Sequence, residues 1–373
     1  MTGNPADRAG AILEIDLAGI AANWRLLERR SRPAECAAVV KADAYGLGAA
    51  RVAPVLAAAG CRRFFVATIE EGIALRRVLP HPAEIAVFHG PWPGCAEEFG
   101  EFRLVPVLND PGQIAVWRCA IARYGEGPAM LHLDTGMARL GLTTAEFDGL
   151  ADELSRPGSI RWRALISHLA CSDEPEHPLN EVQHKRFAAA RRRLPDLPAS
   201  LAASSGIFLG SNFHLDFVRP GAALYGINPR PGHPNPMKQI VTLKGRILQI
   251  REVDRGQSVG YGATHVMGSP GRLATVAVGY ADGWLRSASQ RTTGRIGGIQ
   301  VPLLGRVSMD LVVFDVSGID PSLARPGEFI ELLGEAYGVD AAAADAGTIG
   351  YEVLTALGRR YHRIYRGPNG SQC

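Results

Sequence analysis

Lysine is nearly absent from this chain of 373 residues. Its 40 basic residues include only four lysines, Lys41, Lys185, Lys238 and Lys244, which leaves 36 arginines. Nucleotide bias in the genome is the plain explanation for this imbalance. The imbalance still makes each lysine informative, because arginine cannot supply a titratable amine.

Other absences exclude several classes of protein. The net charge is only +3 and no basic block occurs, which excludes a surface for nucleic acid or an anionic membrane. No uncharged apolar run reaches the roughly 18 residues of a membrane span, and the first residues lack the features of a signal peptide. The six cysteines contain no CxxC pair, so neither a zinc site nor a disulfide scaffold is indicated. The sequence therefore predicts a cytoplasmic protein.

Several catalytic and nucleotide-binding motifs are also missing. The chain contains no GxGxxG, Walker loop, HExxH or GxSxG. These absences leave dinucleotide-binding, metalloprotease and serine-hydrolase interpretations without support.

The sequence from about residue 35 to 230 alternates short apolar runs with segments of helical length. The runs predicted as strands lie at 37–40, 63–68, 84–89, 104–108, 129–134, 163–168, 200–204 and 214–218. Eight strands separated by helices are what a closed TIM-type (βα)8 barrel requires. An open doubly wound sheet is the main alternative, which the number of strands disfavours. Two helix starts are marked, one by a capping box of Thr143 and Glu146 and one by Asn180.

A Pro- and Gly-rich stretch at 228–236 ends this alternation. The later apolar runs, at 240–253, 272–280, 299–316 and 328–334, are strand-like and leave little room for helices, which predicts a mostly β domain. We therefore expect a βα barrel over residues 12–235 and a β-rich C-terminal domain over residues 236–373. Residues 1–11 are free to pack with the second domain.

Lys41 directly follows the first predicted barrel strand. Catalytic groups collect at this end of barrel strands. A lysine there is partly desolvated, which lowers its pKa and makes a neutral amine available for Schiff-base formation. For a random lysine, a charged head that reaches solvent is the better interpretation. The scarcity of lysine in this chain favours the catalytic one.

The segments after predicted strands seven and eight contain Ser204-Ser205-Gly206 and Arg219-Pro220-Gly221. In barrels these two loops often bind phosphate through backbone N–H groups. In another strand order they would be ordinary turns. A phosphate-bearing cofactor that reaches from these loops to an amine on the first strand would fit pyridoxal phosphate (PLP), so we expect the barrel over residues 12–235 to be PLP-binding.

Other polar residues stand at or near predicted strand ends. His168 closes the sixth strand, and His132 lies in the fifth, before a loop that contains Arg139. A histidine at a strand end is about as often a structural group as a catalyst. Tyr261 and Tyr280 are flanked by glycines in the β-rich part, where packing against a sheet edge is the default interpretation.

Eight motifs taken together identify a family resemblance. In chain order they are VVKADAYG, LDTGMARLG, SHLACSDE, FVRPGAALYG, VGYGAT, GYADGW, GRVSMD and TIGYEV. They strongly resemble the alanine racemase family of PLP enzymes, from about residue 12 to 365. The resemblance implies a βα barrel followed by a β domain, in agreement with the patterns above. It also implies interconversion of L-alanine and D-alanine, supplying D-alanine for peptidoglycan.

The resemblance implies two catalytic bases, because racemisation removes a Cα proton from one face and returns one to the other. Lys41 resembles the lysine that binds PLP and acts on the face of the D-enantiomer. Tyr261 resembles the opposing base, which acts on L-alanine. His168 and Arg219 resemble the residues that link this tyrosine to the cofactor, with Arg219 facing the pyridine nitrogen. An arginine there leaves that nitrogen unprotonated, which favours proton exchange over transamination or decarboxylation.

The resemblance implies the remaining binding roles as well. Arg139 and the backbone N–H of Met309 resemble the groups that hold the substrate carboxylate. The residues that resemble the phosphate-binding set are Tyr45, Ser205, Gly221 and Tyr351. In the family, Tyr261 and Met309 come from the partner subunit, so a homodimer with shared active sites is implied. No metal ion is implied.

Two positions depart from the family pattern. Many members have a lysine two residues before DTGM, which can be carbamylated to orient the substrate-binding arginine. This chain has His132 there, and histidine cannot form that carbamate. We hypothesise that His132 orients Arg139 through a neutral hydrogen bond or a bound anion. Ser204 stands where asparagine is common, and we expect it to act as a hydrogen-bond donor.

Three alternative functions remain in view. A decarboxylase shares the two-domain plan, but the chain lacks a glycine-triplet phosphate loop and a CESxD-like segment. A broader-specificity amino-acid racemase is the second, and the missing signal peptide counts against the periplasmic ones. The third is a non-catalytic PLP-binding protein for vitamin handling. Such proteins lack the second domain and need no counterpart of Tyr261.

Overall fold

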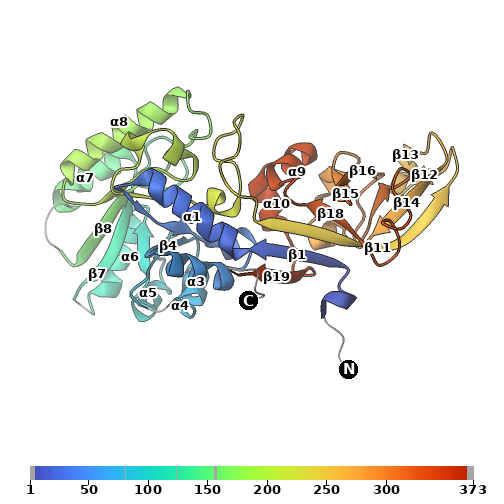
Figure 1. Ribbon diagram of the computed structural model, residues 1–373. Coiled ribbons are helices and arrows are strands. Elements are labelled where there is room, and N and C mark those ends of the chain that lie inside the picture. The colour runs from blue at the N-terminus through green and yellow to red at the C-terminus, as the bar shows by residue number, and fades with distance from the viewer. Residues whose placement is uncertain (1–4, 80, 124, 155–157, 368–373) are drawn as a thin grey trace. The chain divides into compact units, whose positions relative to one another are not determined.

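The computed structural model describes residues 5–79, 81–123, 125–154 and 158–367. The chain divides into two compact units (Figure 1). The first unit is Ile20–Lys238, and the second combines Met1–Gly19 with Gln239–Cys373. No helix among the described residues combines the length and the apolar character needed to cross a membrane.

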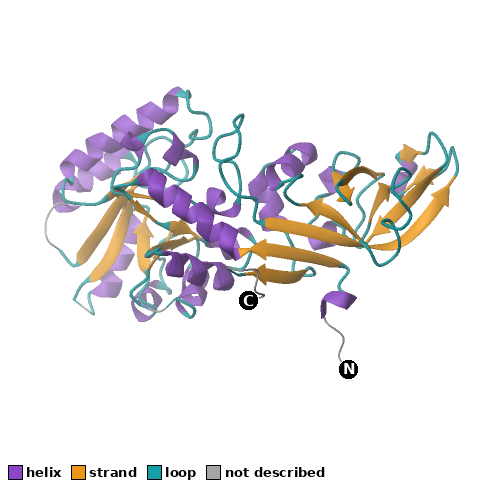
Figure 2. Cartoon of the chain, viewed as in Figure 1, coloured by secondary structure: helices purple, strands orange, loops and turns teal. Residues whose placement is uncertain are grey.

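Short parallel strands form the centre of the first unit, with helices around them (Figure 2). One sheet contains, in order, β3 (Ala38–Val39), β4 (Arg63–Val66), β5 (Glu84–Val87), β6 (Val105–Leu108), β7 (Gly127–His132), β8 (Ile160–Ile166) and β9 (Ala199–Ser200). The eighth strand, β10 (Phe217–Val218), pairs in parallel with β2 (Glu35–Cys36). The N–H of Arg219 donates to Ala202 O and that of Val39 to Pro220 O, both at 2.9 Å. These bonds join β10 to both neighbours, so the predicted (βα)8 barrel is confirmed.

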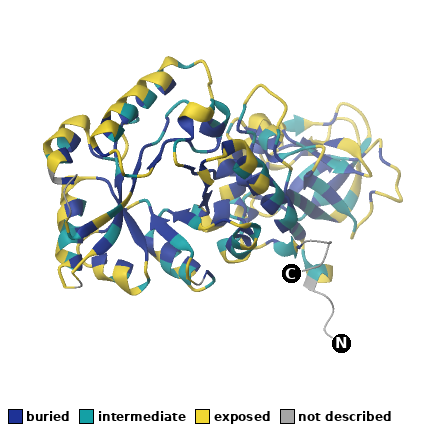
Figure 3. Ribbon diagram, turned by 60° about the vertical axis from the view of Figure 1, so that its left-hand side comes forward, coloured by how far each residue is buried: buried dark blue, intermediate teal, exposed yellow. Residues whose placement is uncertain are grey.

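The barrel strands are apolar because both of their faces are buried. Figure 3 shows them in dark blue, whereas the outer sides of the helices are exposed. The helices are α1 (Leu17–Ser31), α2 (Lys41–Tyr45), α3 (Ala49–Ala59), α4 (Ile69–Arg76), α5 (Ala96–Glu101), α6 (Pro111–Ile121), α7 (Thr144–Leu154) and α8 (Pro178–Arg193).

One of the two predicted helix starts is confirmed. The Glu146 side chain accepts the Thr143 N–H at 2.8 Å, and the Thr143 hydroxyl accepts the Glu146 N–H at 3.2 Å. The prediction for Asn180 is wrong, because α8 begins at Pro178, with the His177 side chain as its cap. Proline suits a first helical position, since it has no N–H to satisfy.

The second unit is mostly β structure, as expected. A ring of six strands runs β11 (Val241–Val253), β14 (Gly271–Val276), β17 (Val312–Asp315), β16 (Ile299–Leu304), β15 (Thr293–Ile296) and β18 (Phe329–Leu333), and β18 pairs with β11 again. The short pair β12 (Ser258–Val259) and β13 (His265–Val266) stands apart. The helices α9 (Val339–Ala346) and α10 (Gly350–Ala356) follow the ring in sequence.

The start of the chain differs from the expected domain limits. We expected residues from 12 onward in the barrel, but β1 (Ala11–Asp16) is antiparallel to β11 and parallel to β19 (His362–Arg366). Alternate residues of β1 are buried, with Leu13 and Ile15 at 0 % exposure. This alternation suits a strand with one buried face, unlike the doubly buried strands of the barrel. Residues 11–16 thus belong to the second unit.

Candidate active site

Polar side chains gather at the C-terminal ends of the barrel strands. The residues are Lys41 after β3, Asn109 after β6, His132 at the end of β7, Arg139 in the loop after β7, His168 after β8 and Arg219 after β10. Burial lowers the pKa values of Lys41, His132 and His168, and the charge of Arg139 lowers all three further, so these groups share one electrostatic environment. The structure therefore brings together four of the predicted site residues, Lys41, Arg139, His168 and Arg219, together with His132.

Lys41 has the environment that the sequence predicts for a reactive amine. Burial is the main cause that lowers its pKa below the ordinary value, and the positive charge of Arg139 lowers it further. Glu71 has the opposite, smaller effect. The Nζ of Lys41 lies 5.9 Å from the centroid of the Phe88 ring. Such an amine becomes neutral more readily than one in water.

Lys41 is followed by a left-handed turn, which the sequence does not predict. The φ angles of Ala42, Asp43, Ala44 and Tyr45 are 52°, 53°, 55° and 56°. Each non-glycine residue in this region costs about 1–2 kcal/mol. The Glu71 carboxylate stabilises the turn, because it accepts the N–H of Ala42 at 2.6 Å. Its other oxygen accepts the N–H of Ala67 at 2.8 Å, just beyond β4.

Glu71→Gln is expected to destabilise the protein by about 1–3 kcal/mol, because the amide nitrogen of glutamine cannot accept a hydrogen bond and one of the two N–H groups loses its partner. The urea midpoint of unfolding measures the loss. The neighbouring Glu70→Gln, at an exposed position of the same helix, serves as the control and should change stability by less than about 0.5 kcal/mol. Equal midpoints for the two variants would show that Glu71 does not hold the turn.

Arg219 is a buried cation, with 3 % of its surface exposed. Its guanidinium donates to the Ser200 hydroxyl and to Ser167 O. No carboxylate among the described residues lies within ion-pair distance of it. Burial lowers its pKa to about 9, which still leaves it charged at neutral pH. A buried charge without a counter-charge is costly, so this position suits a ligand atom that accepts a hydrogen bond.

The two loops predicted to bind phosphate lie against each other and against Tyr45. A Cβ atom at Gly221 would lie 2.3 Å from the Tyr45 hydroxyl, so only glycine fits there. The Ser204 hydroxyl accepts the N–H groups of Gly221 and Ala223 at 3.0 and 3.2 Å. Ser204 therefore acts as an acceptor in these bonds, whereas we expected a donor. Ser205 begins the short 3-10 helix Ser205–Phe208.

Both histidines of the site have strongly lowered pKa values. Burial is the main cause and the charge of Arg219 the second, and they lower the pKa of His132 to about 4 and that of His168 to about 3. Both rings are therefore neutral at physiological pH. A neutral imidazole has one donor and one acceptor nitrogen.

These pKa values predict a loss of stability in acid. Between about pH 6.5 and pH 4, the unfolded chain binds protons that folded His132 and His168 do not. The free energy of unfolding should therefore fall with pH in this window, by about 1.4 kcal/mol per pH unit for each histidine. His132→Gln should remove one such contribution from the slope, as measured by urea unfolding at pH 4.5–7.5. The exposed His233→Gln is the control, and identical slopes in the two variants would contradict the prediction.

Three predicted site residues lie in the second unit, and all are exposed. The exposed fractions are 73 % for Tyr261, 54 % for Met309 and 40 % for Tyr351. Tyr261 begins a short 3-10 helix, Tyr261–Ala263. Met309 lies against Gly279, where a Cβ atom would approach Met309 O to 2.3 Å. The roles of these residues at the active site stay predictions.

Two residues that organise the site, Asn109 and Glu71, are not predicted from the sequence. Glu71 was marked by a capping box with Thr68, which the structure contains. Asn109 directly follows β6 and is 3 % exposed. Its position after a buried strand was the available signal, but the sequence does not reveal its contacts.

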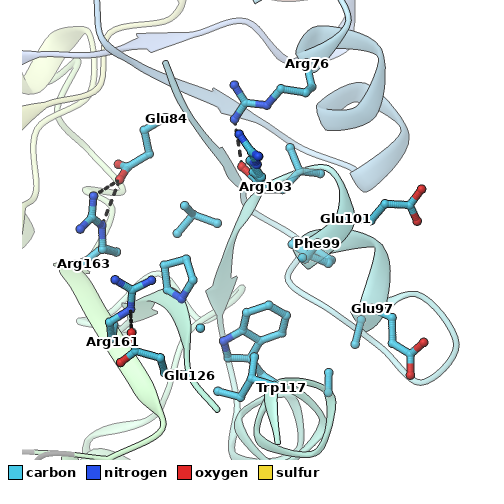
Figure 4. A pocket seen from close by; sticks show the side chains of 18 of the residues that line it. Arg76, Glu84, Glu97, Phe99, Glu101, Arg103, Trp117, Glu126, Arg161 and Arg163 are labelled. Atoms are coloured by element: carbon cyan, nitrogen blue, oxygen red, sulfur yellow. Dashed lines mark hydrogen bonds and ion pairs between the residues drawn. The ribbon is translucent and has the colours of Figure 1, made fainter. Parts of the chain in front are cut away.

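A pocket of about 810 Å³ lies elsewhere, at the opposite ends of the barrel strands (Figure 4). Its lining includes Glu84 and Gly127, the first residues of β5 and β7, and Arg161 near the start of β8. The predicted catalytic residues do not line it. It is therefore distinct from the candidate active site. Among the described residues, no group of three or more His, Cys, Asp or Glu side chains could hold a metal ion.

Comparisons with known proteins cover nearly the whole chain. Residues 15–229 match the family model described as "Alanine racemase, N-terminal domain", and residues 240–365 match "Alanine racemase, C-terminal domain". An alanine racemase of Rhodospirillum rubrum is 53 % identical over 97 % of each chain. A catabolic alanine racemase of Mesorhizobium japonicum is 47 % identical, over 98 % of this chain and 97 % of that one. The crystal structure of alanine racemase from Bartonella henselae with covalently bound pyridoxal phosphate superposes with a TM-score of 0.92. It is 40 % identical, and the match covers 96 % of this chain and 99 % of that one.

Proposed function

This chain belongs to the alanine racemase family, whose members depend on PLP, and from that premise we propose a two-base mechanism for its racemisation of alanine. The observation that carries the proposal is the partly buried Lys41 at the end of a barrel strand, whose pKa is lowered by burial and by the charge of Arg139. Its amine can hold the cofactor covalently and then carry a proton at Nζ.

The residues at the end of the barrel fit PLP. Lys41 supplies the amine, and the buried guanidinium of Arg219, which donates to the Ser200 hydroxyl and to Ser167 O, can donate a further hydrogen bond to the pyridine nitrogen. Gly221, Tyr45, Ser205 and Tyr351 are proposed to bind the phosphate. When bound, PLP withdraws electrons from the substrate and so acidifies its Cα–H.

The remaining residues are proposed to hold the substrate and to move its proton. Tyr261 takes the Cα proton of L-alanine, and Lys41 delivers a proton to the opposite face. Arg139 and the backbone N–H of Met309 bind the carboxylate, which keeps Cα between the two bases. Arg219 and His168 are proposed to connect the cofactor to Tyr261 by hydrogen bonds.

We also propose that the enzyme is a homodimer in which Tyr261 and Met309 complete the partner's active site. Their exposed fractions, 73 % and 54 %, are high for residues of a catalytic site in an isolated chain. A partner subunit that covers them would explain the exposure. The enzyme would supply D-alanine for peptidoglycan in the cytoplasm, and a catabolic role is the alternative that the relative from Mesorhizobium japonicum suggests.

A racemisation assay with a panel of amino acids tests the proposed function. Purified holoenzyme should convert L-alanine to D-alanine and D-alanine to L-alanine, with slower turnover of serine and other small amino acids. Comparable kcat/KM values across the panel would indicate a broader-specificity racemase. Bound PLP without any racemisation would leave the non-catalytic PLP-binding protein as the better interpretation.

A further inference from the structure

Asn109 determines which nitrogen of His132 carries the proton. The Asn109 side-chain nitrogen donates to Phe88 O at 2.9 Å, to Val107 O at 3.0 Å and to Gln113 Oε1 at 3.1 Å. Its Oδ1 is therefore an acceptor, and it lies 2.8 Å from His132 Nδ1. The proton of the neutral imidazole must then lie on Nδ1, which leaves a lone pair on Nε2.

The orientation of the Asn109 amide is fixed by its neighbours. Gln113 Oε1 accepts the backbone N–H of Asn109 at 2.9 Å. The Gln113 side-chain nitrogen donates to His89 O at 2.7 Å, which fixes which end of that side chain is the acceptor. Asn109 itself is 3 % exposed. A flipped Asn109 amide would direct its Oδ1 at three oxygens, Phe88 O, Val107 O and Gln113 Oε1, so the hydrogen-bond network assigns the proton of His132 to Nδ1.

The loop that contains Arg139 folds back over the ring of His132. Leu142 N donates to His132 O at 2.8 Å, and Asp134 N donates to Leu142 O at 2.9 Å. Gly141, with φ of 109°, lies so close that a Cβ atom there would be 3.2 Å from His132 Cδ2. Cδ2 is bonded to Nε2, so the acceptor nitrogen lies on the side of the ring that faces this loop.

The carboxylate nearest to Arg139 in the sequence is already used. Asp134 Oδ1 accepts the N–H groups of Gly136 and Met137, both at 2.8 Å, and Oδ2 accepts that of Ala138 at 3.0 Å. Among the described residues, no carboxylate forms an ion pair with Arg139. Its guanidinium therefore needs another acceptor if it is to be held in one orientation.

The other groups around His132 are mostly positive. Arg219 and Arg139 lower its pKa, and Asp134 raises it. Lys41 and His168 belong to the same group of charges. Besides burial and the arginines, His132 and Lys41 each lower the pKa of His168. A protonated His132 would add a further positive charge to the cluster, so the neutral form is favoured.

We propose that His132 is a positioning residue for the substrate carboxylate. Asn109 fixes its tautomer, and the unprotonated Nε2 would accept a hydrogen bond from the guanidinium of Arg139 when alanine is bound. This inference rests on the proposed function, in which Arg139 binds the carboxylate of alanine. In this proposal two neutral side chains, Asn109 and His132, orient the guanidinium of Arg139, and no bound anion is needed.

Replacing the acceptor while keeping the ring tests the proposal. His132→Phe should raise the KM for alanine about tenfold or more, because a hydrogen bond to a charged group is lost, and kcat should change much less. His132→Gln should stay within about threefold of the parent KM, because its amide offers both a donor and an acceptor. Equal KM values for the parent and His132→Phe would overturn the proposal, as would a fall in kcat alone.

Asn109→Asp tests the role of the tautomer through pH. A carboxylate at this position favours the protonated imidazole, whose Nε2 can no longer accept from Arg139. The ratio of variant to parent KM should therefore be high near pH 6 and fall as the pH rises toward 9. Asn23→Asp is the matched control, because Asn23 is also buried in the first unit and donates to two backbone oxygens. A KM ratio that is independent of pH in Asn109→Asp, as in this control, would overturn the proposal.

Two further measurements separate the possible outcomes. In ¹⁵N spectra of the holoenzyme, the His132 signals, assigned as those missing in His132→Gln, should show a proton on Nδ1 and none on Nε2. A proton on Nε2 would overturn the proposal. Replacing chloride by gluconate should leave the parent KM unchanged, and a rise would show that a bound anion orients Arg139. If the parent does not racemise alanine, the proposed function fails; if only these effects are absent, the inference on His132 fails.

Discussion

Lys41→Ala should abolish racemisation of alanine, with a loss of about 10⁴-fold or more. The variant loses both the amine that would hold the cofactor covalently and one of the two proposed bases. Lys41 is partly buried beside Arg139, so solvent-exposed lysines cannot take over either task. The rate of D-alanine formation and the visible absorbance of the purified protein measure the two losses.

Two other substitutions make this prediction specific. Lys41→Arg keeps a positive charge but supplies no amine that deprotonates near neutral pH, so it should be as inactive as Lys41→Ala. Lys185→Ala removes one of the few other lysines, whose side chain is 75 % exposed, and should keep parental activity. Activity in Lys41→Arg above about 1 % of the parent rate would contradict the proposed role of the amine.

Tyr261→Phe should lower racemisation in both directions by about 10²–10⁴-fold, because each direction needs a base on both faces of Cα. The same variant should still exchange the Cα proton of D-alanine with solvent deuterium, since Lys41 serves that face alone. Exchange of the Cα proton of L-alanine should be lost. Proton NMR of each enantiomer in D₂O measures these rates.

Tyr280→Phe is the matched control for this variant. Tyr280 also lies in the second unit beside a glycine, and it is 42 % exposed. Its substitution should leave both exchange reactions intact. If Tyr261→Phe exchanged the Cα protons of both enantiomers at equal rates, Tyr261 would not be the base for L-alanine.

The sequence predicts the barrel well because its strands are short apolar runs buried on both faces. Such runs are apolar along their whole length, so they can be recognised without knowledge of their tertiary contacts. Eight of them predict the closed ring of β3 to β10. The limits of the units were harder to predict. The strand β1 precedes the barrel in sequence, yet it pairs with β11 and β19. Pairing between segments more than 200 residues apart leaves no local signal.

The candidate site was predictable only in part. Lys41 stood out through its rarity and its place at a strand end, whereas the left-handed turn after it contradicts the local preferences of alanine and tyrosine. The turn forms because Glu71, from another helix, accepts the N–H of Ala42. The tautomer of His132 likewise depends on Asn109, 23 residues away in the sequence. Contacts between distant residues determine both features.

Racemisation of L-alanine in D₂O tests the two-base proposal most directly. The first D-alanine formed should carry solvent deuterium at Cα, because the proton that Tyr261 removes on one face cannot reach the other face, where Lys41 delivers a deuteron. Mass spectrometry of D-alanine at a few per cent conversion gives the isotope content. Nearly complete deuteration is the predicted result. D-alanine that retains the Cα proton of its L-alanine precursor would mean transfer by a single base and would contradict the account.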